Sequence, residues 1–534
     1  MSSVESTANF RTRIHTMRRR LQDALVIEAS ATSIDGRTFT YEAPVSEAMP
    51  PGSFVAIDAG DTRIYLARIL ENDIVEREGP EISLDNSSEL TRSEDLAGIA
   101  IQGVSVRVRL RYARGSGILI GRIDGERSGA TGEIDQFDGA AIGPVTSDQL
   151  SHFLESHSQG RTALPIGTQA GFDPQIPATM LASGFGRHTF LVGQSGSGKT
   201  YSLGVILEQL LLETDLRIII IDPNSDYVRL RDIREQVAAN DPELAARYRD
   251  AASGIRVFRP AGRAGSEEET LRIHFSSLTE RVQAMVLRID PLEDREEYDA
   301  FRTIVQQMTT ETYSLADVEA AARTSLSHAS RQVALRIAAL NNSGWGIWAE
   351  ADQPALSNLD GDWRALILDV GGFEQRDEKS LLANAVLQSL WARRNDRQPY
   401  LIVIDEAHNI CPQEPEDPIQ QMVTERAISI AAEGRKFGLY LLLSTQRPSK
   451  IHINVLSQCD NLVLMRMNSA DDLHQLKHTF SFVPESLFDR SSTFAQGESL
   501  IAGKIAPLPL MINFGARVSQ EGGSDVADDW TRRS

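Results

Sequence analysis

The chain has 534 residues, and its 54 Lys and Arg against 74 Asp and Glu give a formal net charge of −20. With 41% hydrophobic and 24% charged residues, the composition is that of a folded protein of roughly two to four domains, which excludes a wholly disordered chain or a fibrous repeat. The acidic balance argues against a protein that coats nucleic acid nonspecifically, but it is compatible with a local basic channel.

The two cysteines, Cys411 and Cys459, are too few for a disulfide framework or a zinc cluster, and they indicate a reducing, cytoplasmic setting. The longest apolar runs, such as Ile218–Ile221 and Leu439–Leu443, fall far short of the ~18 residues that span a bilayer, so we expect no membrane association. The N-terminal segment is polar and then rich in arginine, and it lacks the apolar stretch of a secretory signal.

Residues 1–125 contain short strand patterns separated by turns, which predicts a small N-terminal β-barrel. The candidate strands are Arg37–Tyr41, Ser53–Ile57, Ile64–Ile69 and Val104–Tyr112. In the last of these, apolar residues alternate with Ser105, Arg107, Arg109 and Arg111, so one face is apolar and the other basic. The basic stripe fits either a solvated face or a nucleic-acid contact.

Residues 126–161 begin with a stretch rich in Gly, Asp and Ala, and they predict a linker. From 162 to 515, short apolar strands alternate with longer helical stretches, the pattern of an α/β domain with a parallel sheet. Between about 275 and 350 the strand signals vanish and apolar residues recur at helical spacing, which predicts a helical insertion. Residues 516–534 are rich in Gly, Ser and Asp and predict a mobile tail or arm.

The expected strands of this α/β domain are Thr189–Val192, Arg217–Asp222, Ile255–Arg259, Ala365–Asp369, Leu401–Asp405, Leu439–Ser444 and Leu462–Arg466, with a final hairpin from Glu498–Ala502 and Leu508–Phe514.

One segment matches the phosphate-binding pattern GxxxxGK[ST] at every fixed position, with an apolar strand before it and a helical pattern after it, as the motif requires. Glycines let backbone N–H groups point at a phosphate, and the helix N-terminus adds its positive end. We therefore expect Lys199 to reach the β and γ phosphates of ATP and the Thr200 hydroxyl to bind Mg²⁺. The expected nucleotide-binding residues are Gly193, Gln194, Ser195, Gly196, Ser197, Gly198, Lys199, Thr200 and Tyr201.

Acidic residues follow two of the apolar strands. Asp405 and Glu406 end one strand and Asp222 ends another, and the carboxyl ends of parallel strands form the ligand-binding edge of an open sheet. We expect Asp405 to hold the hydration shell of Mg²⁺ and Glu406 to orient and polarise the attacking water. Asp222 either supports the metal or the water, or simply ends its strand.

Gln446 follows the strand at 439–444 and would lie beside the catalytic strand, where it can sense the γ-phosphate; the alternative is a polar turn before Pro448. Arg435 stands between Gly434 and Gly438 at the end of a predicted helix. That position fits an arginine finger or a plain helix C-cap. His408 fits a structural polar group better than a metal ligand.

In this order the motifs resemble the HerA/FtsK superfamily of ring-shaped P-loop translocases, and HerA-like proteins most closely. The resemblance implies a RecA-like ATPase core that uses ATP and Mg²⁺, and a hexamer that pumps double-stranded DNA through a central pore. It also implies that Glu406 is the catalytic base, Gln446 the sensor and Arg435 the arginine finger of a site between subunits. Arg187 resembles a second arginine that reaches a neighbour's nucleotide. Where the family often has Gly-Glu-Tyr, this chain has Ser225, Asp226 and Tyr227.

HerA-like proteins work with partner effectors, so the resemblance implies an ATP-driven DNA translocase or helicase in DNA end processing or antiphage defence. The expected partner is a NurA-like nuclease or a sirtuin-type or other defence effector. The alternative is a nucleotide-gated assembly scaffold that activates its partner without processive DNA pumping. The ten His do not group with acids at metal-ligand spacing, so we expect any DNA cutting to come from another chain.

Overall fold

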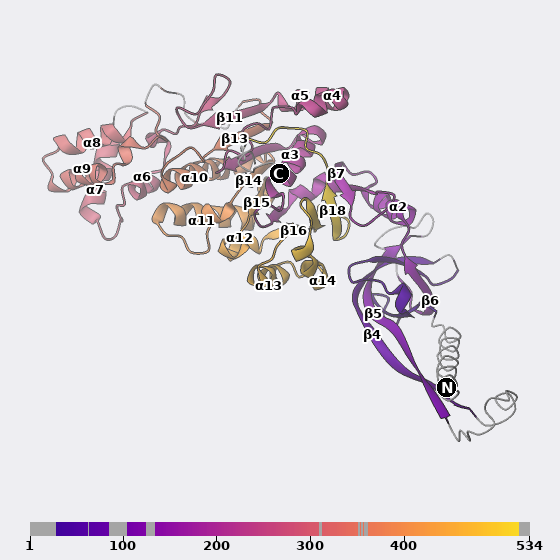
Figure 1. Ribbon diagram of the computed structural model, residues 1–534. Coiled ribbons are helices and arrows are strands. Elements are labelled where there is room, and N and C mark those ends of the chain that lie inside the picture. The colour runs from indigo at the N-terminus through magenta and orange to yellow at the C-terminus, as the bar shows by residue number, and fades with distance from the viewer. Residues whose placement is uncertain are drawn as a thin grey trace, which may run out of the picture. The chain divides into compact units, whose positions relative to one another are not determined.

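The computed structural model describes residues 28–61, 63–84, 104–123, 134–308, 312–350, 353, 356 and 361–522, without the side chains of 79–84 and 104–110. The basic N-terminal segment and the last part of the predicted tail lie outside these residues. The chain divides into two compact units, Met1–Gln159 and Gly160–Ser534 (Figure 1). No helix among the described residues is both long enough and apolar enough to cross a bilayer.

The first unit is a closed barrel. Its strands follow one another around the barrel in the order β1 (Ser30–Ser33), β2 (Thr38–Pro44), β5 (Val104–Arg122), β4 (Ile64–Leu84), β3 (Phe54–Asp58) and β6 (Phe137–Pro144). Alternate residues fill the interior, as the period of two requires, and Phe39 and Tyr41 are the large rings of β2. Glycine is required opposite them, because a Cβ on Gly117 would lie 2.4 Å from the Phe39 ring. The expected N-terminal barrel is confirmed.

The barrel ends later in the chain than the sequence predicts. β6 pairs with β1 and β3 and closes the barrel, and α2 (Ser147–Ser158) follows, with a capping box formed by Thr146 and Gln149. The prediction that the barrel ends at 125 and that 126–161 is a linker is therefore wrong for residues 137–158. β6 reads FDGAAIGP, and its Gly and Ala have little strand propensity, so the pairing with β1 and β3 determines the strand.

The basic stripe of β5 lies opposite acidic residues of β4. In the antiparallel register Arg111, Arg109 and Arg107 stand opposite Glu76, Glu78 and Glu81. Arg111 Nε lies 2.9 Å from Glu76 Oε1. Because Arg111, the one arginine of the stripe whose side chain is described, is paired with Glu76 across the two strands, its position favours the solvated face over a nucleic-acid contact.

The second unit is built on one 12-stranded sheet. Its strand order is β12 (Glu269–Thr270), β11 (Ile255–Arg259), β13 (Ala365–Asp369), β10 (Arg217–Asp222), β14 (Tyr400–Ile404), β15 (Leu439–Thr445), β9 (His188–Val192), β16 (Cys459–Leu464), β17 (Glu498–Ala502), β18 (Leu510–Phe514), β7 (Ala163–Gln169) and β8 (Pro177–Leu181). The strands from β12 to β16 are parallel, and β17, β18, β7 and β8 extend the sheet in antiparallel pairs. β10 is an unbroken apolar run because both faces of a parallel sheet are covered.

Helices cover the two faces of this sheet. Figure 1 shows α3 (Lys199–Glu213), α4 (Glu235–Asn240) and α5 (Pro242–Ala252) on one side, and α10 (Arg376–Ala392) and α11 (Pro418–Glu433) on the other. Short helices α12 (Ile453–Leu456), α13 (Ala470–Thr479) and α14 (Glu485–Asp489) follow β15 and β16. This layered α/β arrangement confirms the expected P-loop core.

The predicted helical insertion is also confirmed. Between β12 and β13 the chain forms α6 (Glu280–Val286), α7 (Arg295–Gln306), α8 (Leu315–Thr324) and α9 (His328–Leu340). Their buried apolar residues, among them Phe301, Val318 and Ile337, belong to the same hydrophobic core as the strands of the sheet.

The first residues of the predicted tail are packed against the core. Arg517, Val518 and Ser519 are buried, and Arg517 and Ser519 bond to the carboxylate of Glu208 in α3. The expectation of a mobile arm from residue 516 is therefore wrong for 517–522. The composition predicted a mobile tail because this segment lacks an apolar run. Polar contacts hold it instead, and these leave no signal in the composition.

Candidate nucleotide-binding site

The phosphate-binding loop lies between β9 and α3, and its glycines occupy positions that other residues fit poorly. Gly196 and Gly198 have φ of +73° and +92°, in the left-handed region where a side chain is strained. A Cβ on Gly193 would lie 2.6 Å from Ser197 Oγ. Because α3 begins at Lys199, the free N–H groups of its first turn belong to the loop, as phosphate binding requires.

The ends of two neighbouring strands converge on the amine of Lys199. Lys199 Nζ lies 2.7 Å from Asp405 Oδ1 and 3.0 Å from Glu406 Oε1, both after β14, and 3.0 Å from Ser444 Oγ in β15. Burial alone lowers the pKa of Lys199, but the two carboxylates outweigh it and raise the pKa above its ordinary value. The lysine is therefore a fixed positive charge beside two acids at the carboxyl edge of the sheet.

Glu406 is held from several sides. Gln446 Nε2 donates to its Oε1 at 2.9 Å, and His408 Nδ1 lies 3.3 Å from its Oε2 and 3.0 Å from Thr445 Oγ1. Burial raises the pKa of Glu406, yet the contacts with His408, Lys199 and Gln446 together lower it to about 2. Its backbone is left-handed, with φ of +43°, which is strain of the kind found at functional sites. Glu406 is thus an ionised, oriented carboxylate.

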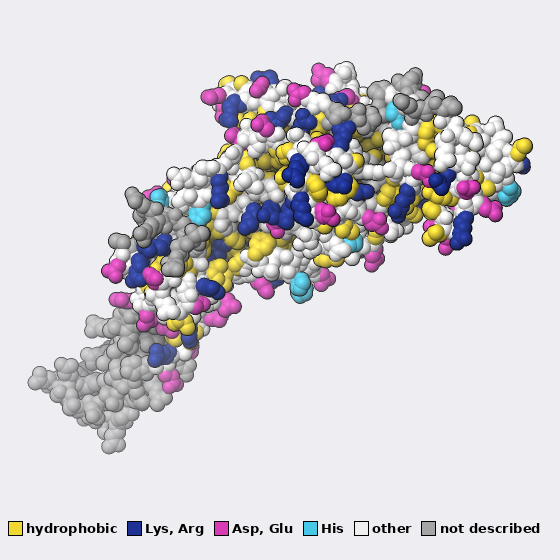
Figure 2. Space-filling view, turned by 180° about the vertical axis from the view of Figure 1, so that it is seen from behind, with side chains coloured by type: hydrophobic (Ala, Val, Ile, Leu, Met, Phe, Trp, Pro, Cys, Tyr) yellow, Lys and Arg dark blue, Asp and Glu magenta, His cyan; other side chains and the backbone are white. Residues whose placement is uncertain are grey.

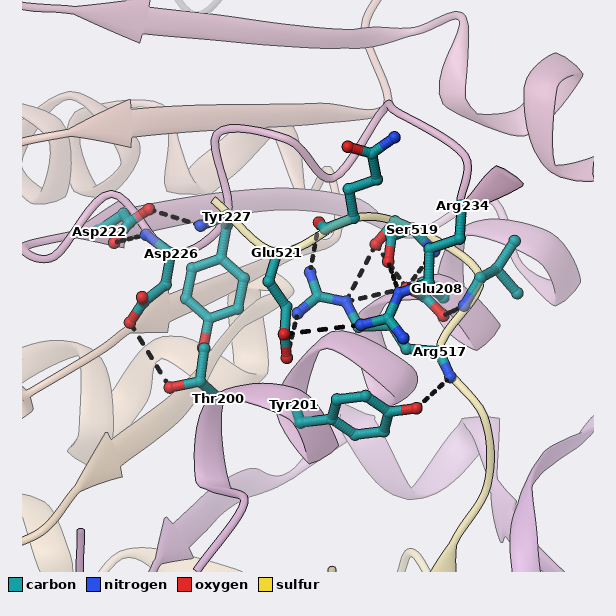
Figure 3. Close-up of polar contacts among 12 residues, drawn as sticks. Thr200, Tyr201, Glu208, Asp222, Asp226, Tyr227, Arg234, Arg517, Ser519 and Glu521 are labelled. Atoms are coloured by element: carbon teal, nitrogen blue, oxygen red, sulfur yellow. Dashed lines mark hydrogen bonds and ion pairs between the residues drawn. The ribbon is translucent and has the colours of Figure 1, made fainter. Parts of the chain in front are cut away.

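The Thr200 hydroxyl donates to Asp226, at 3.5 Å between Oγ1 and Oδ2 (Figure 3). Asp222, the predicted metal partner, is fully buried, and its two oxygens accept the backbone N–H groups of Asn224, Asp226 and Tyr227. Burial is the main cause that raises the pKa of Asp222 to about 7. We therefore revise the metal assignment: Asp222 anchors the loop, and Asp226 faces the hydroxyl.

The residues around Thr200 fit a magnesium ion. Mg²⁺ binds oxygen ligands and is usually held by one or two carboxylates together with substrate phosphates and water. Thr200, Asp226 and Asp405 supply a hydroxyl and two carboxylates, and Asp405 Oδ2 is a buried acceptor for which the described residues provide no hydrogen bond. Nowhere in the described part of the chain do three or more His, Cys, Asp or Glu form a group suited to a metal ion. The phosphates would therefore have to complete the coordination.

The two arginines predicted to act at a neighbouring site lie far from Lys199. Arg187 and Arg435 both contact Asp460 Oδ2, at 3.5 and 2.7 Å. Arg187 precedes β9 and Arg435 precedes β15, whereas the phosphate-binding loop and Gln446 follow these strands. With strands of 5 and 7 residues and about 3.3 Å per residue, the arginines lie on the order of 20 Å from the lysine end of the sheet.

Three contacts of the phosphate-binding loop were not predicted. Arg466 Nη2 donates to the Gly196 carbonyl at 3.2 Å, and Gly497 N donates to the Ser197 carbonyl at 3.0 Å. The hydroxyl of Tyr201 accepts from Arg517 N at 2.8 Å, so Tyr201 anchors the C-terminal segment. Of these residues, only Arg466 could have been expected near the loop, because it ends a predicted strand.

Comparison with known families agrees with this geometry. The sequence profile of the central domain of the helicase HerA matches residues 166–405, from β7 through the phosphate-binding loop to Asp405. The chain is a P-loop ATPase whose central part resembles that of the HerA-like helicases. Glu406, Arg435 and Gln446 lie beyond the matched range, so the profile does not bear on their roles.

The HerA-like chain is similar to curated proteins over most of its length. It is 23% identical to the DNA double-strand break repair helicase HerA of Pyrococcus furiosus over 400 residues, which are 65% of this chain and 70% of that protein. It is 22% identical to a probable helicase of Methanocaldococcus jannaschii over 395 residues, 69% of this chain and 70% of the other. Among solved structures, VirB4 of Thermoanaerobacter pseudethanolicus is similar with a TM-score of 0.45 and 14% identity, over 66% of this chain and 96% of that one.

Proposed function

We propose that this HerA-like ATPase is a translocase of double-stranded DNA that works as a ring, with six subunits as the expected number. The observation that carries the proposal is the position of Arg187 and Arg435. Both lie at the sheet edge opposite Lys199 and Glu406, so neither reaches the nucleotide of its own subunit. In a head-to-tail ring the edge that bears arginines meets the edge that bears the phosphate-binding loop, and each site is completed by the next copy.

The residues at the carboxyl edge of the sheet, around Lys199, are suited to ATP hydrolysis. Lys199 and the N–H groups at the start of α3 would bind the phosphates. Thr200, Asp405 and Asp226 would hold Mg²⁺, which supplies charge neutralisation on the phosphates when bound. Glu406, ionised and fixed by Gln446 and His408, is placed to orient a water and take its proton. Gln446 follows β15 and bonds to Glu406. A movement of Gln446 on loss of the γ-phosphate would therefore shift the catalytic base.

Binding of DNA by an acidic chain requires local positive charge. Figure 2 shows several Lys and Arg side chains gathered near the middle of one face, with acidic side chains scattered around them. Salt screens charges beyond about 8–10 Å, so such a local surface can hold phosphates although the formal net charge is −20. We propose that DNA binds to a basic surface of the ring, and that binding weakens steeply with salt.

A mixing experiment tests the shared site. Arg435→Ala and Glu406→Gln subunits are each expected to be inactive, but in mixed rings some interfaces combine a native Glu406 with a native Arg435 from the next subunit. Random 1:1 mixing in a head-to-tail ring places these two together at about a quarter of interfaces, so DNA-stimulated ATPase should return to roughly that fraction of the unmutated rate.

The matched control is a mixture of Lys199→Ala with Glu406→Gln. Both defects then lie on the same side of the interface, and no activity should return. If the first mixture stays inactive although mixed rings form, or if the chain stays monomeric with nucleotide and DNA, the shared site is refuted.

We also propose that the chain acts with a partner effector in DNA end processing or antiphage defence, a proposal supported only by the resemblance to HerA-like proteins. A cytoplasmic location belongs to the same proposal, and Cys411 and Cys459 are both unpaired. The Glu406→Gln variant separates motor from scaffold. If ATP-bound Glu406→Gln activates the copurified effector as well as the unmutated chain does, DNA pumping is not required and the scaffold is correct.

A further inference from the structure

We propose that the C-terminal residues 517–522, here called the C-terminal strap, position Asp226 at the metal side of the nucleotide site. The proposal rests on the proposed ATPase site and adds to it Asp226 as a metal-binding acid and the strap as its positioning element. Figure 3 shows the arrangement: the strap crosses α3 and then runs along the loop that carries Asp226.

The strap is anchored first on α3. Glu208 and Arg517 are both fully buried, and Arg517 Nε lies 3.2 Å from Glu208 Oε1. The other oxygen of Glu208 accepts Val518 N at 2.7 Å, and its Oε1 also accepts Ser519 N at 2.9 Å. The guanidinium lies directly over Gly204, where a Cβ would be 2.4 Å from Arg517 Cζ. The same helix that begins with Lys199 and Thr200 thus holds the strap.

The second part of the strap binds the loop after β10. Val518 accepts the Arg234 backbone N–H at 3.0 Å, and Gln520 N donates to the Asp232 carbonyl at 2.8 Å. Arg234 Nε donates to the Ser519 carbonyl at 2.9 Å. At the tip, Gly522 N donates to the Asp226 carbonyl at 3.0 Å, and a Cβ on Gly522 would lie 2.1 Å from the Ser225 carbonyl oxygen. The strap therefore ties α3 to the turn at 225–226.

This turn needs external support. Ser225 has φ of +62°, a left-handed conformation that a non-glycine residue adopts only at a cost. Asp222 holds the Asp226 backbone N–H from inside the sheet, and Gly522 holds the Asp226 carbonyl from outside. Because its backbone N–H and carbonyl are both hydrogen-bonded, Asp226 is held with Oδ2 toward the Thr200 hydroxyl. Loosening the strap should therefore weaken metal binding without removing any metal-side group.

The test measures Mn²⁺ affinity by electron paramagnetic resonance, with the full chain saturated with a non-hydrolysable ATP analogue. Gly522→Ala forces the tip away from Ser225 and keeps the Glu208–Arg517 anchor. Asp226→Asn removes the acid itself. Each should weaken Mn²⁺ binding about tenfold, as loss of a metal-orienting contact does. Affinity for the analogue in EDTA should stay within twofold. The double variant should be no weaker than Asp226→Asn alone, because the strap acts through Asp226.

Arg234→Ala loosens the strap more mildly and replaces Gly522→Ala if that variant does not fold. Its matched control is Arg231→Ala on the same loop, whose partner is Glu267 and not the strap. The proposal is overturned if Asp226→Asn weakens Mn²⁺ binding and the strap variants do not, if the effects add, or if Asp226→Asn has no effect. Failure of the proposed function looks different, because the unmutated chain then would not bind the analogue at all.

Discussion

Arg435 and Asp460 form an ion pair, with 2.7 Å between Nη1 and Oδ2, and Arg187 approaches the same oxygen at 3.5 Å. Each of the three side chains is about two-fifths exposed. The two arginines that would complete a neighbour's site are therefore bound, within one subunit, to a single carboxylate. To reach a neighbour's nucleotide, both must leave Asp460.

We predict that Asp460→Asn raises the ATPase rate of the assembled ring. Exposed ion pairs contribute only about 0.2–1 kcal/mol, so their loss should release the arginines and increase the rate or lower KM by up to roughly fivefold. Arg435→Ala, in contrast, should lower the rate ~10³-fold or more. Steady-state ATPase assays with DNA compare them. If the ATPase rate of Asp460→Asn falls as far as that of Arg435→Ala, the arginines act while bound to Asp460.

Gln446 is predicted to control the protonation of Glu406. In the unmutated chain the lowered pKa of about 2 keeps Glu406 ionised, so its protonation should not limit the rate above about pH 4. Gln446→Glu would place a second carboxylate where Nε2 now donates, and repulsion would raise the Glu406 pKa. The acid limb of the pH–rate profile should then lie at a higher pH than in the unmutated chain. Gln446→Ala should lower kcat by about 10²-fold without that acid limb. A profile unchanged by Gln446→Glu would contradict the contact.

His408 is predicted to position Glu406 and not to bind metal. Its Nδ1 lies between Glu406 Oε2 and Thr445 Oγ1. His408→Ala should lower kcat about tenfold with little change in nucleotide affinity, because one support of the base is lost. His408→Asn places an amide nitrogen near the position of Nδ1 and should recover most of the rate. Equal losses in both variants would show that the imidazole ring, and not this contact, is required.

Asp222 is predicted to make stability depend on pH. Its folded pKa of about 7 lies above the usual 3.8, so the folded state binds the proton more tightly. The resulting stabilisation is complete below pH 3.8 and is lost as pH rises through 7. Asp222→Asn removes this dependence, so the thermal midpoint of the unmutated chain minus that of the variant should decrease from pH 5 to pH 8. A constant difference across this range would contradict the raised pKa.

Apart from Arg187 and Arg435, which precede strands, the site residues predicted from the sequence follow directly after strands or lie within a continuous motif. Lys199 and Thr200 belong to one loop whose geometry is local. Glu406 and Gln446 each follow an apolar run, and β14 and β15 are neighbours, so their side chains meet at one edge. For the fold, the expected strands of the α/β core match the observed ones to within three residues, because buried parallel strands are unbroken apolar runs.

The local sequence does not indicate which of Asp222 and Asp226 faces the Thr200 hydroxyl. The two acids stand four residues apart on a loop, and the path of that loop determines which side chain turns inward to backbone amides and which faces Thr200. β6 likewise became a strand through its pairing with β1 and β3, because its Gly and Ala carry little strand signal of their own.

The sequence by itself determined the phosphate-binding loop, the acids and the sensor after their strands, and the alternation of strands and helices around them, because these depend on spacing within a few residues. Only the tertiary structure determined that Asp226 faces Thr200, that Arg187 and Arg435 share Asp460, and that residues 517–522 bind α3. These contacts join segments up to about 300 residues apart, as in the 309-residue separation of Glu208 and Arg517, and their polar groups leave no periodic pattern in the chain.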